Sequence, residues 1–133
     1  MVLKKLTLVS ALYTIFLTTA PVHAGDVTVP DELKFLYLNG EKIATSFFGH
    51  TEKITIVAGP TNIVLQYEDV IEGEISDDHT VFESLPFAIS FRAERSRDYH
   101  LTINPPANEE EARQFTQAPS VVLTDGNNIR VPF

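Results

Sequence analysis

The densest group of side chains that could hold a cation is acidic. Asp77, Asp78 and His79 follow one another, and Glu72 and Glu74 come shortly before them. Ca²⁺ takes several oxygen ligands from a turning loop, which an acidic loop can supply. This stretch lacks the alternating Asp and Asn spacing and the central Gly of an EF-hand loop. A solvated loop explains it better than a metal site, and we predict no bound metal.

Other residue types that carry catalysis lack their usual supporting motifs. His50, His79 and His100 are far apart in the sequence and form no His-x-x-x-His pair for zinc. No G-x-S-x-G stretch marks a serine nucleophile. The carboxylates of 109–111 could serve a glycosidase, but a run of Glu at a helix start is already explained by the helix dipole. We therefore predict no catalytic residue, no cofactor and no enzymatic activity.

Two surface features remain as candidates for binding a partner. Phe47 and Phe48 form an apolar pair in an irregular stretch, where such a pair can make a contact patch. A loop tucked under a sheet is the commoner explanation for that pattern. Arg92, Arg95 and Arg97 cluster around one expected hairpin end, where a basic spot could hold a carboxylate or sulfate group. The commoner explanation there is a strand end protected against edge pairing. These five residues are the candidate partner-binding residues.

The start of the chain predicts export. Lys4 and Lys5 supply a positive beginning, residues 6–20 form an uncharged apolar run, and Val22-His23-Ala24 forms a small-x-small cleavage site. The apolar run of about 15 residues is shorter than the length that spans a bilayer as a helix. We expect a signal peptide over 1–24 that is cleaved after Ala24, a periplasmic location, and no membrane span after cleavage.

Composition limits the remaining function classes. The whole chain has 133 residues and a formal net charge of −8, and all 18 acidic residues lie after the expected cleavage site. Such an acidic domain argues against nucleic acid as a partner, because neutralising phosphates needs clustered Lys and Arg. The absence of cysteine removes disulfides, thiolate metal ligands and Cys nucleophiles together. We expect a protein partner in the cell envelope.

The segment 25–133 has the pattern of an antiparallel β domain. Short apolar–polar alternations are separated by turn residues, and Asn39-Gly40 between two such runs predicts a hairpin. We expect Lys53–Val57 to be followed by a return strand over 62–68, with Pro60 in the turn because proline cannot donate to a ladder.

Further along, Phe87–Ala93 is expected to pair with 98–103 as a hairpin, and two last strands are expected over 121–123 and 129–131. The side chains expected in the core are Phe35, Leu36 or Leu38, Ile54, Ile56, Val64, Tyr67, Phe87, Ile89, Phe91, Leu101, Ile103 and Phe115.

One helix is expected near 108–117. Asn108 is a good N-cap, three Glu residues follow it, and Ala112 and Phe115 can face a sheet together. The predicted fold is therefore all-β and mainly antiparallel, a β-sandwich or partly open barrel with one short helix, in a single domain over 25–133. The apolar end of the sequence suggests truncation at the C-terminus.

Three segments in the same order resemble a known family. The tract 108–119 has the form N-E-x-E-A-x-x-F-x-x-A-P and is followed by an apolar strand and Asp125-Gly126. Together with 36–43 and 62–68, it resembles uncharacterised protein family 0319, also called domain of unknown function 2057, a group of exported bacterial proteins. The resemblance implies a periplasmic location and brings no established activity, cofactor or site residues. Family members are typically longer, and the group is associated with restraint of curli amyloid assembly.

These observations favour an exported, non-enzymatic binding or accessory protein. Its expected mechanism is pairing of an exposed strand edge with another extended chain, which would restrain curli-type amyloid growth. The edges expected from the sequence are 27–29 and 121–123. The alternative is an envelope hydrolase or carbohydrate-binding protein that uses carboxylates of the acidic loops.

Overall fold

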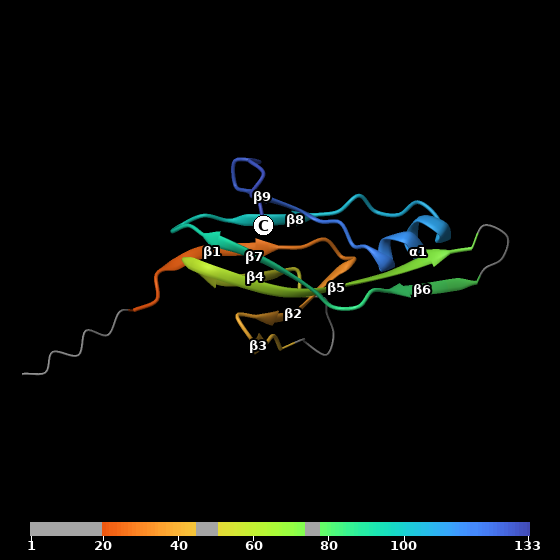
Figure 1. Cartoon of the computed structure of the whole chain (residues 1–133), viewed down its shortest axis with the longest axis horizontal. Coiled ribbons are helices and arrows are strands. Elements are labelled where there is room, and N and C mark those ends of the chain that lie inside the picture. Colours follow the sequence, from red (N-terminus) through yellow and green to blue (C-terminus); the bar gives the residue numbers. More distant parts are fainter. Residues whose placement is uncertain (1–19, 45–50, 74–77) are drawn as a thin grey trace, which may run out of the picture.

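Short strands and one helix follow each other in a computed structural model that describes residues 20–44, 51–73 and 78–133 (Figure 1). The elements in chain order are β1 (His23–Thr28), β2 (Leu33–Leu38), β3 (Glu41–Lys42), β4 (Lys53–Val57), β5 (Gly59–Glu72), β6 (His79–Glu83), β7 (Phe87–Ala93), β8 (Tyr99–Thr102), α1 (Glu109–Gln117) and β9 (Val122–Asp125). The expectation of a mainly antiparallel all-β fold with one short helix is confirmed.

The first sheet has the order β4-β1-β8-β9. β4 and β1 run antiparallel, as do β8 and β9, whereas β1 and β8 run parallel. The segment 27–29 was expected at a sheet edge, and this expectation was wrong. β1 is an interior strand because β8, far away in the sequence, supplies its second neighbour.

The second sheet is built around the long strand β5. β2 pairs with one side of β5, and β3 extends the sheet beyond β2. On the other side, β6 pairs with 68–72 of β5 and β7 pairs with 59–65, so that β6 and β7 follow one another along the same side. β6 was not expected from the sequence, and β5 extends further than expected, because the charged residues around 72–78 obscured the alternation.

The expected hairpin at Asn39-Gly40 is confirmed. Both residues have positive φ, 48° and 84°, which Asn and Gly tolerate. The expected hairpin between β4 and the strand after it was wrong, because β4 belongs to the first sheet and β5 to the second. Pro60 lies inside β5 opposite Arg92, not in a turn. The β2 pairing reaches only Ile63, so the missing N–H of Pro60 interrupts no ladder.

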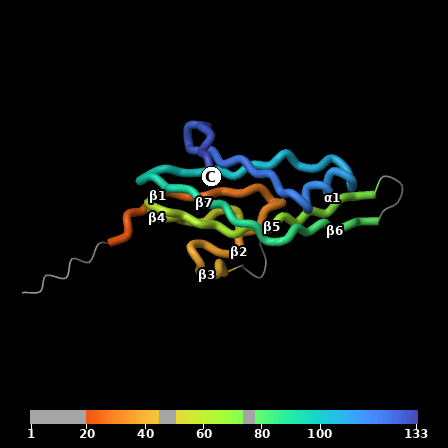
Figure 2. The backbone as a smooth tube through the Cα atoms, viewed as in Figure 1, coloured from red at the N-terminus to blue at the C-terminus, as the bar shows by residue number. Residues whose placement is uncertain are grey.

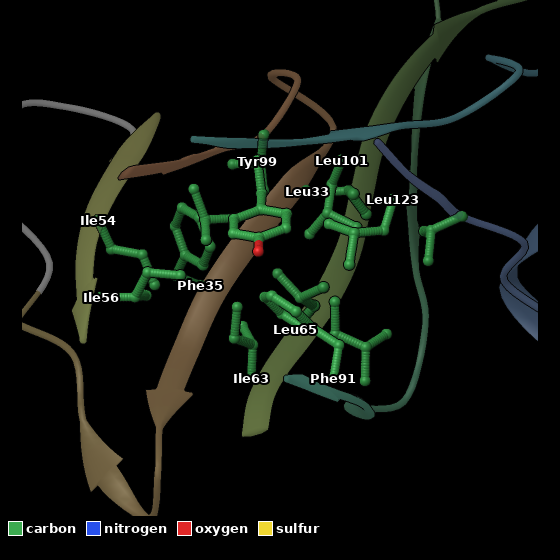
Figure 3. Packing of buried hydrophobic residues seen from close by; sticks show 14 of the residues in the cluster. Leu33, Phe35, Ile54, Ile56, Ile63, Leu65, Phe91, Tyr99, Leu101 and Leu123 are labelled. Carbon is green, nitrogen blue, oxygen red and sulfur yellow. The ribbon is translucent and has the colours of Figure 1, made fainter. Parts of the chain in front are cut away.

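The core lies between the two sheets. Alternate residues of both sheets point into it, and Figure 3 shows Tyr99 of β8 among side chains of β2, β5 and β7. The Tyr99 ring contacts Phe91 with centroids 5.0 Å apart, and its hydroxyl accepts from the Glu94 N–H at 2.8 Å. Of the predicted core side chains, seven are buried: Phe35, Ile54, Ile56, Tyr67, Ile89, Phe91 and Leu101.

The remaining core predictions are less deeply placed. Leu38, Phe87, Ile103 and Phe115 are half-buried and pack against the core. The choice of Val64 was wrong: it is half-buried on the opposite face of β5, whereas its neighbours Ile63 and Leu65 are fully buried. In a continuous run of apolar residues, either the odd-numbered or the even-numbered side chains could face the core. The sequence alone therefore did not show that Ile63 and Leu65, and not Val64, point inward.

The predicted helix is confirmed as α1. Asn108 caps it by accepting from the Glu111 N–H at 2.9 Å, and its first turn is acidic. Ala112 is buried, and the Phe115 ring lies 4.5 Å from that of Tyr67. Figure 2 shows α1 beside the β5–β6 hairpin, which it contacts.

The expected hairpin of Phe87–Ala93 with 98–103 was wrong, since β7 and β8 lie in different sheets.

Candidate functional site: an open strand edge

The candidate residues from the sequence do not form one site. Phe47 and Phe48 lie outside the described residues. Arg97 is bound at both sides: its guanidinium lies 2.7 Å from a carboxylate oxygen of Glu94 and 3.6 Å from one of Asp125. Asp125 is almost fully buried, so Arg97 serves to hold the structure together.

Arg92 and Arg95 are exposed and form no ion pair among residues 20–44, 51–73 and 78–133. Arg92 projects from the outer face of β7, beside a shallow hollow that Asn62 and Ser90 also line. The Asn62 amide donates to the Ser90 hydroxyl at 2.7 Å. Arg92 is thus the one predicted residue on a polar surface of a sheet, while Arg95 lies in the β7–β8 connection.

The acidic and histidine candidates do not come together in the described part of the chain. Within that part, no group of three or more His, Cys, Asp or Glu side chains could hold a metal ion. His100 Nδ1 lies against the Thr28 hydroxyl. Glu110 pairs with Arg113, and Glu111 accepts from the Ala107 N–H, so both carboxylates have roles in the helix start.

The outer edge of β7 presents unpaired backbone groups. On β5, the Glu68 N–H bonds toward β2, whereas the Tyr67 C=O accepts from Ser84 on the opposite side. Because these directions alternate along a strand, odd-numbered residues of β5 bond toward β7. Their partners in β7 include Ile89 and Phe91. The remaining β7 peptides, at 88, 90 and 92, therefore point away from β5.

The side chains at these three β7 positions suit an added strand. Ala88, Ser90 and Arg92 are exposed, and the first two are small. Among the described residues, β5 is the only strand that pairs with β7. An incoming extended segment could form a ladder with these backbone groups.

A second open edge belongs to β4. The Val29 N–H donates to the Glu52 C=O, which fixes the alternation between β1 and β4. The peptides of Lys53, Thr55 and Val57 then point away from β1. Lys53 lies 3.7 Å from Asp26, and Val57 is 41% exposed. This edge is shorter than that of β7.

The predicted edge at 121–123 is covered by the chain itself. β9 does end its sheet, but the Val131 N–H donates to the Leu123 C=O at 2.8 Å, and Arg130 bridges to Thr124. β7 was not expected as an edge, because its sequence was expected to form a hairpin with β8. Its outward Ala-x-Ser-x-Arg pattern was the available signal.

Over the residues that the structure describes, the fold and its open edges define a two-sheet, mainly antiparallel β protein with one short helix. Its sequence from residue 26 to 133 matches the profile of a family described as "Uncharacterized protein conserved in bacteria (DUF2057)". The chain belongs to this family, as the resemblance in the sequence indicated.

Relatives from several bacteria agree with this assignment. The chain is 28% identical over 131 residues to a UPF0319 protein of Shewanella oneidensis, covering 98% of this chain and 58% of the relative. A UPF0319 protein of Shewanella baltica is 27% identical, with 98% and 57% covered. The UPF0319 protein YccT of Salmonella heidelberg is 28% identical over 113 residues, with 85% and 51% covered. The chain thus spans little more than half the length of these relatives.

No solved structure matches this chain. Within the residues that the structure describes, no helix has the length and apolar character needed to cross a membrane.

Proposed function

We propose that this chain is an exported, non-enzymatic binding protein of the periplasm that captures extended segments of other polypeptides on the β7 edge. The single observation that carries the proposal is the row of outward peptides at Ala88, Ser90 and Arg92, next to small exposed side chains. Three residues with outward N–H and C=O groups give an added strand a hydrogen-bonded ladder.

The narrower form of the proposal is restraint of curli-type amyloid growth. A fibril grows by adding strands to an open edge. A folded domain that pairs with such an edge through β7 ends the ladder there. The other side of β7 is already paired with β5 and cannot accept the next subunit. All 18 acidic residues lie in this domain, so copies of it repel each other, which favours capping over joint assembly.

The test uses a proline on the open edge. The Ser90 N–H points away from β5, so Ser90→Pro removes a donor for the incoming strand without removing a bond to β5. Ser90→Ala is the matched control, because both variants lose the bond from the Asn62 amide to the hydroxyl but alanine keeps the N–H. Thr55→Pro and Thr55→Ala form the equivalent pair for β4.

The assay follows seeded fibril growth of a curli-type subunit with the chain purified from the periplasm of a bacterial host. We expect wild type and Ser90→Ala to slow elongation at substoichiometric ratio, and Ser90→Pro to lose most of this effect while unfolding at nearly the same urea concentration. Unchanged elongation at a large excess of wild type would refute amyloid restraint. Equal inhibition by Ser90→Pro and Ser90→Ala would refute pairing at the β7 edge. If Thr55→Pro is the only variant that loses inhibition, the pairing site is the β4 edge.

A further inference from the structure

A hollow of about 570 Å³ lies where β6 ends and β7 begins. Gln66, Leu85 and Phe87 line it together with Gln117 at the end of α1. The Gln66 side chain lies on the outer face of β5, whereas α1 packs against Tyr67 on the inner face. Since its lining comes from both faces, the hollow opens at the sheet's edge, in line with the open edge of β7.

The hollow has an apolar side that the backbone holds in place. Leu85 is 84% exposed, and Phe87 beside it is half-buried. The preceding Ser84 is buried, and it bonds to Tyr67 twice: its N–H donates to the Tyr67 C=O, and its hydroxyl accepts from the Tyr67 N–H. The break between β6 and β7 is therefore a fixed part of the fold, and it projects Leu85 outward.

The hollow also has an uncompensated negative side. Glu83 stands opposite Glu68 in the β5–β6 ladder. Glu68 is neutralised by Lys34, whose ammonium lies 2.5 Å from the carboxylate. Glu83 accepts only from the Gln66 amide, at 2.9 Å, and forms no ion pair in the described chain.

The end of α1 adds to this negative potential. Its last turn carries no basic side chain. Thr116 and Gln117 of that turn line the hollow, so the negative end of the helix dipole lies beside it.

We infer that this hollow selects which extended segments the β7 edge takes: segments of another polypeptide that carry Lys or Arg next to an aliphatic residue. The aliphatic side chain would pack on Leu85 and Phe87, and the cation would lie beside Glu83. Charge complementarity argues for this occupant, since Glu83 and the helix end both favour a cation. The inference rests on the proposed strand addition at β7 and adds a sequence preference to it.

The test uses a blocked Lys peptide, Lys-Leu-Thr-Val-Thr-Val-Thr-Val-Thr, and a Glu peptide with Glu in place of Lys. Each is also made in reversed sequence, so that in either strand direction one version places its charge at the hollow and a neutral residue beside Arg92. Binding is measured by fluorescence anisotropy at low and high salt, with the chain purified from the periplasm. Glu83→Gln removes the charge and keeps an acceptor for Gln66, while Leu85→Ser changes a side chain that is already exposed.

We expect wild type to bind the Lys peptide about three- to fivefold more tightly than the Glu peptide, as an exposed ion pair allows, with the preference falling at high salt. Glu83→Gln should bring the two affinities within twofold, and Leu85→Ser should weaken both peptides. A preference that persists in Glu83→Gln, or none in wild type, would overturn the inference. Equal binding by Ser90→Pro and Ser90→Ala would instead overturn strand addition at β7, so the two failures are distinguishable.

Discussion

Replacing Asp125 with alanine should destabilise the fold through three lost contacts. Oδ1 of Asp125 accepts from the N–H groups of Asn127 at 2.9 Å and Ile129 at 3.0 Å, and Oδ2 lies 3.6 Å from Arg97. Each backbone bond contributes about 0.5–1.5 kcal/mol. The ion pair adds less than about 1 kcal/mol, because the Arg97 side chain is 41% exposed. We expect Asp125→Ala to lower the free energy of unfolding by about 2–3 kcal/mol.

Urea denaturation followed by circular dichroism measures this loss. A midpoint shift of about 2 M is expected for a chain of this size. Asp125→Asn keeps the Oδ1 acceptor and loses only the charge, so it should cost less than about 1 kcal/mol. Glu94→Ala is the control, because it breaks the exposed ion pair to Arg97 and should change stability by less than about 0.5 kcal/mol. If Asp125→Ala unfolds within 0.5 M of wild type, the reasoning about this turn is wrong.

Two further predictions concern crowding and pH. A Cβ added at Gly25 would lie 2.4 Å from the Arg97 carbonyl oxygen, so Gly25→Ala should cost about 1–3 kcal/mol by urea denaturation. Gly126→Ala is the control and should change the free energy of unfolding little, because the atom nearest to its added Cβ is 4.0 Å away. Equal destabilisation by the two substitutions would contradict the prediction. Burial, the nearby Asp69 carboxylate and the hydrogen bond to it raise the pKa of Tyr67. Above a pH of about 10 the unfolded chain ionises at this tyrosine while the folded chain does not, so stability should fall by up to about 1.4 kcal/mol per pH unit more in wild type than in Tyr67→Phe. If the free energies of unfolding of wild type and Tyr67→Phe change in parallel from pH 8 to 11, this prediction is refuted.

Features set by neighbouring residues could be predicted from the sequence. The Asn39-Gly40 turn needs only two residues that tolerate positive φ. The cap at Asn108 needs only an acceptor three residues before a free N–H. Both predictions are confirmed because no distant contact decides them.

Strand partners depend on the whole core and were predicted less well. Hairpins between successive strands are the default expectation, and they placed β7 with β8. In the structure, the β7–β8 connection crosses between the sheets, and Tyr99 packs against Phe91 across the core. The candidate edge at β7 follows from this topology, so its residues could be listed from the sequence but not recognised as an edge. Arg92 was singled out for the charge of its side chain, whereas the proposed function uses its backbone N–H and C=O groups.

The interior position of β1 also constrains the order in which the chain can fold. Thr28 of β1 pairs with His100 of β8, 72 residues later. A polypeptide that emerges N-terminus first, from a ribosome or a membrane pore, presents β1 long before its second neighbour exists. Such distant pairing slows folding, because the loop must close before its contacts contribute. During that interval β1 itself has an exposed edge, so the folding chain is open to pairing with other strands until β8 reaches it.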